Sequence, residues 1–98
     1  MFAVVRRLTV KPGTFDEAIR RDESGLLPIL SSAPGFVEFT LLQVGEDVGV
    51  SVTIFETQEQ ADEANRRAAE WIKENMIPLS AGPAEAIGAG KVLLHKTK

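Results

Sequence analysis

Several side chains in this sequence are of types that bind or activate a small organic molecule: Arg6, Asp22, Asn65, Trp71, Asn75 and His95. An arginine that points inward holds a carboxylate or enolate and stabilises developing negative charge. A buried carboxyl or a histidine accepts a proton near neutral pH. Two amides beside an indole ring suit an aromatic ligand that carries carbonyl groups. These types together predict acid–base chemistry on a small molecule.

Two adjacent arginines, Arg6 and Arg7, lie on a predicted strand, so only one of them points inward. Alternation places Arg6 on the same face as Val4. The inward arginine either binds a substrate anion or forms an ion pair with Asp22 or Glu38, and the sequence leaves both alternatives open.

Two candidates for a proton acceptor stand out. Asp22 lies inside the apolar stripe of the first predicted helix, where a carboxyl either acts as a base with a raised pKa or pairs with Arg6. His95 is the only histidine, so no metal site is expected. It is either a lone general base at the end of the last strand or part of a frayed terminus.

The second predicted helix carries an apolar face with polar exceptions. At 100° per residue, Asn75 falls in the middle of this face and Asn65 at its border. The face consists of Ala61, Ala64, Ala68, Trp71 and Ile72. Small alanines either bring the helix close to the sheet or leave a cavity. The alternative to ligand binding is that Asn75 bonds backbone at the helix end, Asn65 caps a loop and Trp71 belongs to the core.

The elements that position these residues follow from apolar patterning. It predicts strands over 2–10, 36–44, 48–55 and 91–95, and helices over 15–31 and from Thr57 to about Met76. Gly25 and Pro28 predict a weakened or kinked second half of the first helix. Gly82-Pro83 predicts a turn before the last strand.

Both helices begin with the spacing of a capping box. Thr14 with Glu17 opens the first, and Thr57 with Gln60 opens the second. We therefore expect each threonine to accept a hydrogen bond from the first turn of its helix.

The order of elements is β, α, β, β, α, β. Two right-handed crossovers around a hairpin predict a single domain over residues 1–98 of α+β class, a ferredoxin-like sandwich with a four-stranded antiparallel sheet and both helices on one face. Strands one to three carry apolar residues on both faces, and this pattern predicts a homodimer that packs sheet to sheet into an α+β barrel.

Four segments carry a family resemblance: Arg6–Gly13, Pro34–Phe36, Thr53–Glu56 and Asn65–Asn75. Through them the chain resembles the small antibiotic-biosynthesis-monooxygenase-like group of the dimeric α+β barrel superfamily, over nearly its full length. The superfamily includes cofactor-free monooxygenases acting on polyketide phenols and quinols, haem-degrading enzymes and muconolactone isomerases. The resemblance therefore implies the fold more directly than a reaction.

Two departures from relatives bear on the cofactor and the chemistry. Haem degraders resemble one another in an Asn, a Trp and a His at places that here hold Arg6, Ala64 and Glu74, so no haem or other cofactor is expected. The polyketide monooxygenases often use a tyrosine near the substrate, and this chain has none.

Composition excludes other classes of protein. The net charge is −3 and the 11 basic residues are scattered, so nucleic acid is not an expected partner. No apolar run is long enough to span a membrane. Cysteine is absent, which indicates a cytoplasmic protein without disulfides.

The leading hypothesis is a monooxygenase-like enzyme with a pocket between sheet and helices. Trp71 and Asn65 position an aromatic or quinol-like substrate, Arg6 stabilises its anion, and His95 or Asp22 takes the proton. The alternative is a non-catalytic dimer that binds a metabolite or serves in regulation. A third hypothesis is that side chains fill the pocket.

Overall fold

The structure, a computed structural model, describes residues 1–82 and 84–98. Its elements in chain order are β1 (Phe2–Thr9), α1 (Phe15–Arg21), a π-helical segment (Asp22–Leu26), α2 (Leu27–Ser31), β2 (Phe36–Gly45), β3 (Val48–Phe55), α3 (Gln58–Asn75), a 3₁₀ turn (Ile77–Leu79) and β4 (Glu85–Lys91). The predicted Gly82-Pro83 turn includes Pro83, which lies outside the described residues.

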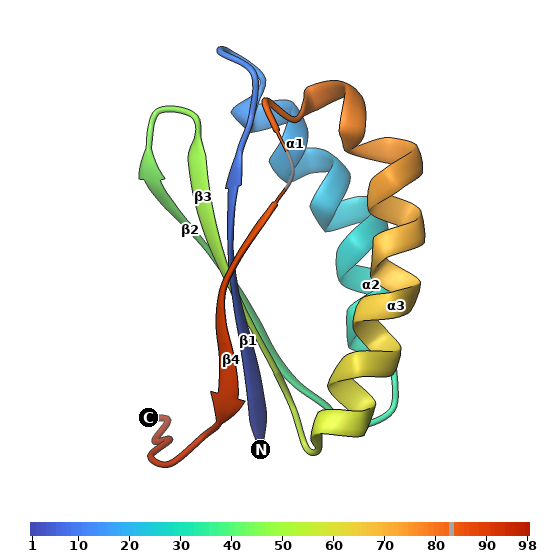
Figure 1. The fold of residues 1–98 in the computed structure, drawn as a ribbon, viewed down its shortest axis with the longest axis vertical. Helices are drawn as coiled ribbons and strands as arrows, with labels where there is room; N and C mark the ends of the chain where they lie inside the picture. The colour runs from blue at the N-terminus through green and yellow to red at the C-terminus, as the bar shows by residue number, and fades with distance from the viewer. Residues whose placement is uncertain (83) are drawn as a thin grey trace.

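The strands form one antiparallel sheet in the order β2-β3-β1-β4. All the helices pack on one face of this sheet, as Figure 1 shows. The predicted ferredoxin-like α+β sandwich is therefore confirmed. Among the described residues, no helix has the length and apolar character needed to cross a membrane.

The first helical region is continuous but changes pitch at the predicted weak point. The backbone N–H of Leu27 bonds to the carbonyl of Asp22, five residues earlier, which is the π-helical pattern. Pro28 has no N–H and would clash with the carbonyl four residues before it in a regular α-helix. The wider π-helical turn relieves this conflict and lets the helix continue as α2.

One of the two predicted capping boxes forms as expected. The Thr57 hydroxyl accepts a hydrogen bond from the Gln60 N–H at 3.2 Å. The prediction at Thr14 is wrong, because its hydroxyl donates to the carbonyl of Lys11 at 2.7 Å and caps nothing. The backbone of Thr14 lies near φ −105° and ψ 4°, outside the extended region that a capping side chain requires.

The core lies between the sheet and the helices. The α3 alanines, Ala61, Ala64 and Ala68, are almost completely buried, as are Leu30 and Phe55. Their small side chains let the α3 backbone approach the sheet closely. Along most of α3, these alanines therefore bring the helix and the sheet together and do not leave a cavity.

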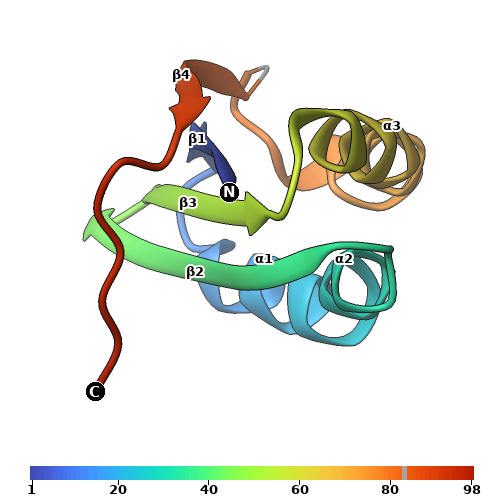
Figure 2. The ribbon, with the colours of Figure 1, turned by 90° about the horizontal axis from the view of Figure 1, so that it is seen from below.

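The predicted last strand over 91–95 is wrong. Strand β4 ends at Lys91, which pairs with Phe2 at the start of β1. Beyond Val92, whose N–H bonds to the Met1 carbonyl, no neighbouring strand remains to supply hydrogen bonds. Residues 92–98 instead form a tail that crosses the sheet face opposite the helices (Figure 2).

The sheet face opposite the helices is strongly apolar. Leu42 is 49% exposed there, and its neighbours on the face are half-buried valines and alanine. The register places these residues together: Ala3, Val5, Val50 and Val52. We call this surface the open sheet face.

Candidate functional site

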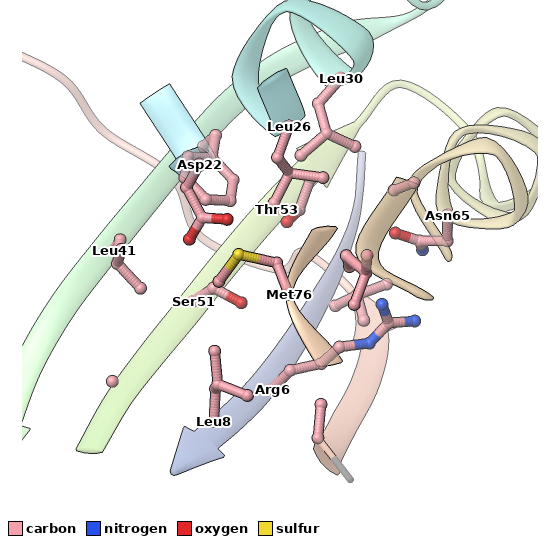
Figure 3. Close-up of a pocket in the computed structure, with 16 residues that line it drawn as sticks. Arg6, Leu8, Asp22, Leu26, Leu30, Leu41, Ser51, Thr53, Asn65 and Met76 are labelled. Atoms are coloured by element: carbon pink, nitrogen blue, oxygen red, sulfur yellow. The ribbon is translucent and has the colours of Figure 1, made fainter. Parts of the chain in front are cut away.

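A pocket of about 90 Å³ lies between the sheet and the helices. Figure 3 shows its lining side chains converging from β1, β2 and β3 on one side and from the helices on the other. Most of the wall is apolar, including Leu8, Leu26, Leu30, Leu41 and Ile72. The pocket is therefore a mostly apolar site with a few polar groups, as expected for small-molecule binding.

Arg6 is the arginine that points into this pocket. Its register partners are Ser51 on β3 and Ala86 on β4. Arg7 lies on the open sheet face and donates to the Glu85 carboxylate at 2.6 Å. The alternation of side chains along β1 thus gives the two arginines different surroundings.

In the part of the chain that the structure describes, Arg6 forms no ion pair. Neither structural pairing considered from the sequence is present: Asp22 is not a partner, and Glu38 lies near His95. Arg6 and Asp22 are the only charged residues among those that line the pocket. The guanidinium is therefore available to a ligand.

Asp22 enters the pocket from the first residue of the π-helical segment. Burial raises the pKa of this carboxyl from 3.8 to about 6, because the charged form loses hydration that nothing nearby replaces. A carboxyl with such a pKa exchanges protons close to neutral pH, as a general base or acid requires. π-Helical segments of this kind are frequent at functional sites.

Asn65 reaches the pocket from α3. In Figure 3 the Arg6 guanidinium extends toward the side of the pocket where Asn65 lies, whereas the Asp22 carboxyl lies on another side. A guanidinium and an amide that line the same pocket are each suited to bind an oxygen atom that carries negative charge.

Two hydroxyl groups in the pocket were not predicted as site residues. Ser51 and Thr53 lie on β3 and line the pocket, and Thr53 is buried. The signal was present in the sequence, since Gly49, Ser51 and Thr53 alternate with valines along the predicted strand. These hydroxyls add hydrogen-bonding groups to a part of the pocket wall that is otherwise mostly apolar.

Trp71 and Asn75 do not line the pocket. Trp71 packs against both apolar clusters of the core. The Asn75 side-chain amide donates to the Trp71 backbone carbonyl at 2.9 Å, and the Asn75 backbone carbonyl accepts from the Arg21 guanidinium at 2.6 Å. Both residues occupy the structural roles that were the alternatives to ligand binding.

His95 lies on the other side of the sheet from the pocket. Its Nε2 is 3.5 Å from Glu38 Oε1, and Glu38 is the register partner of Ile54 on the open sheet face. The tail that carries His95 follows this face in Figure 2. The sheet therefore separates the imidazole from Arg6, Asp22 and Asn65.

Comparison with known proteins gives a family match and several structural neighbours. The sequence model of the antibiotic biosynthesis monooxygenase family matches residues 1–70. The comparison with curated proteins gave no match. A protein of unknown function from Nitrosomonas europaea has a similar structure, with a TM-score of 0.80 and 20% identity over 99% of this chain and 93% of that one.

Two further neighbours have ligands bound. A monooxygenase from the gene ActVA-Orf6 of Streptomyces coelicolor, in complex with Nanaomycin D, has a TM-score of 0.73 and 19% identity over 98% of this chain and 92% of that one. A mutant of MhuD with two manganese protoporphyrin IX bound per active site has a TM-score of 0.74 and 20% identity over 100% of each chain. At such identities these likenesses show the fold.

A porphyrin does not fit the residues of this pocket. No histidine lines it in the described residues, and His95 is on the far side of the sheet. A volume of about 90 Å³ is also far below that of a tetrapyrrole. Among the residues described, no group of three or more potential metal ligands occurs. The polar side chains that the pocket offers to a ligand are those of Arg6, Asp22, Asn65, Ser51 and Thr53.

Proposed function

The chain belongs to the antibiotic biosynthesis monooxygenase family, and from this membership we propose that it oxidises a small phenol or quinol with dioxygen in the pocket between sheet and helices. The observation that carries the proposal is the convergence of Arg6, Asp22 and Asn65 on one apolar pocket. The Streptomyces coelicolor neighbour, a monooxygenase with Nanaomycin D bound, supports the same class of activity.

The proposed reaction begins with removal of a proton. Asp22 takes the proton from the substrate hydroxyl, because its raised pKa makes the carboxylate a stronger base than an exposed aspartate. Arg6 and Asn65 stabilise the resulting anion, which is a far better electron donor than the neutral phenol. The apolar wall keeps water from competing for these contacts.

The anion then reacts with dioxygen without another reductant. For a phenol, the products are a quinone and one water molecule: one oxygen atom enters the ring and the other leaves as water. The substrate supplies all four electrons and both hydrogens of that water. This chain would supply the base, the positive charge and the dry surroundings.

The decisive experiment is to measure oxygen consumption with simple phenols and hydroquinones, with uncatalysed autoxidation subtracted. We expect oxygen uptake and quinone formation in equal amounts. Asp22→Asn should lower kcat by about 10²-fold, the usual contribution of a general base. Glu23→Gln is the matched control, because Glu23 is the exposed neighbour of Asp22 and loses the same charge.

Two results would contradict the proposal. If no phenol or quinol causes oxygen uptake while the same compounds bind, the pocket belongs to a non-catalytic binding protein. If Asp22→Asn and Glu23→Gln oxidise substrate at the rate of the unmodified chain, Asp22 is not the base.

We further propose that the protein works as a homodimer through the open sheet face and resides in the cytoplasm. The exposed Leu42 and the half-buried valines beside it support the first proposal. The absence of cysteine supports the second.

A further inference from the structure

The placement of the three polar groups constrains the substrate more tightly than the family does. Resting on the function proposed above, we propose that the substrate is a single aromatic ring with a hydroxyl group at one end and a carboxylate or conjugated carbonyl at the opposite end. The hydroxyl meets Asp22, and the oxygen atoms at the far end meet Arg6 and Asn65.

The first argument is that Asp22 and Arg6 face different parts of the pocket. Both side chains line it, and in the described residues they form no ion pair with each other. Figure 3 shows the two side chains directed to different sides of the pocket. The oxygen that loses a proton and the oxygen that Arg6 binds are therefore different atoms.

The second argument concerns how charge moves through the ligand. When a hydroxyl on an aromatic ring loses its proton, the negative charge spreads through the ring to a conjugated oxygen on the opposite side. A ligand with such an oxygen delivers this charge to Arg6 and Asn65 at the moment when Asp22 takes the proton. A simple phenol has no oxygen at that end and leaves the guanidinium without a partner.

The third argument is size. The pocket is partly open to solvent, and its volume of about 90 Å³ is smaller than the roughly 150 Å³ of an engineered closed cavity that binds benzene, so it admits at most one ring, part of which lies in the open mouth. One ring occupies the space between apolar side chains such as Leu26, Phe39 and Ile72. Fused rings have no room without displacement of the wall.

The experiment measures binding by isothermal titration calorimetry under argon, so that turnover does not consume the probes. The probes are para-hydroxybenzoate, phenol, benzoate and a hydroxynaphthoate that carries the same two groups on fused rings. On the unmodified chain, para-hydroxybenzoate should bind at least about 10-fold more tightly than each of the others. This comparison needs no variant and so does not depend on the folding of one.

Variants then assign the two ends of the ligand. Arg6→Met should weaken para-hydroxybenzoate binding by about 10-fold or more and leave phenol binding unchanged, and Arg6→Lys should restore part of the loss. Arg7→Met is the matched control, because Arg7 is adjacent in sequence but lies on the open sheet face. Asp22→Asn should reduce the preference for para-hydroxybenzoate over benzoate.

Three outcomes would overturn the inference: equal binding of phenol and para-hydroxybenzoate, equal effects of Arg6→Met and Arg7→Met, or binding of the hydroxynaphthoate as tight as that of the single ring. Oxygen uptake distinguishes these failures from failure of the proposed function. Uptake with phenols of every kind, without dependence on Arg6, would overturn the substrate class alone. Arg6-dependent binding of para-hydroxybenzoate without oxygen uptake would overturn the oxidation alone.

Discussion

The indole ring of Trp71 lies directly against the backbone of Gly25. A Cβ atom at residue 25 would overlap the ring atoms Cζ2, Cε2 and Nε1. Gly25 belongs to the π-helical segment that begins at Asp22, so this contact joins α3 to the segment that carries the proposed base. The tryptophan that the sequence suggested as a ligand platform instead holds the first helical region in place.

Replacing Gly25 with alanine should therefore destabilise the protein, even though alanine favours helix by about 1 kcal/mol relative to glycine. The added methyl group has no space, and overpacking of this kind costs about 1–3 kcal/mol. We expect a net decrease in the free energy of unfolding, measured by urea denaturation. Gly88→Ala is the control, because a Cβ at residue 88 meets nothing within 4 Å.

The same contact predicts a non-additive double variant. Trp71→Phe removes part of the indole, so Gly25→Ala should cost less in that background than in the unmodified chain. Equal costs in both backgrounds would show that the strain at residue 25 does not come from Trp71.

The buried carboxyl of Asp22 should make stability depend on pH. The pKa is about 6 in the folded state and 3.8 for the free side chain, so the folded state holds the proton more tightly between these values. Stability therefore decreases as pH rises from about 4 to 6, and the full cost of burying the charge remains above that range. Below the lower value both states are protonated and the cost vanishes.

Asp22→Asn should remove this cost. Because Asp22 is only partly buried, solvent screening reduces the gain to about 1 kcal/mol in the free energy of unfolding at neutral pH. Denaturation across pH 4 to 8 measures it, with Glu23→Gln as the control for net charge. A gain of the same size at pH 4 would contradict the assignment to Asp22.

Most of the fold could be predicted because the apolar patterning of the sequence agrees with the way the strands pair in the structure. The strand over 48–55 and the α3 helix have clear alternation or capping signals, and the structure places them within a residue or two of the predicted bounds. The last strand could not be predicted, because Val92, Leu93 and Leu94 favour a strand more strongly than the residues of β4 do. The available partner on β1 decides the pairing, and local sequence does not contain that information.

The residues of the candidate site could likewise be predicted only in part. Alternation on a strand correctly placed Arg6 toward the helices, and helical periodicity placed Asp22 and Asn65 toward the sheet. The position of His95 depended on the wrongly predicted strand. The π-helical segment that carries Asp22, and the contact of its Gly25 with Trp71, could not be predicted, because only the packed structure reveals them.

The two amides of α3 should behave differently when replaced. Asn65→Leu should lower kcat/KM for oxygen-dependent turnover by about 10²-fold without loss of stability, because the amide lines the pocket and contacts the substrate anion in the proposed mechanism. Asn75→Leu should cost about 1 kcal/mol of stability through the lost bond to the Trp71 carbonyl and leave turnover within twofold. Reversed effects of the two variants would contradict the pocket assignment.

The open sheet face predicts self-association. Sedimentation equilibrium at micromolar concentration should show a dimer, and Thr40→Lys with Leu42→Lys should give a monomer, because both residues are exposed on this face. Ile77→Lys is the control, since Ile77 is 56% exposed but lies in the 3₁₀ turn after α3. A monomer in the unmodified chain would refute the sheet-to-sheet arrangement.

His95→Gln tests whether the pocket within one chain is complete. The imidazole lies across the sheet from Asp22, and its exposed contact with Glu38 is worth less than about 1 kcal/mol. We therefore expect turnover within twofold of the unmodified chain and a free energy of unfolding that changes by less than about 1 kcal/mol. Loss of turnover with unchanged stability would show that the imidazole takes part in the reaction. In that case the tail of a second copy would have to bring His95 to the pocket, and Asp22 would no longer suffice as the base.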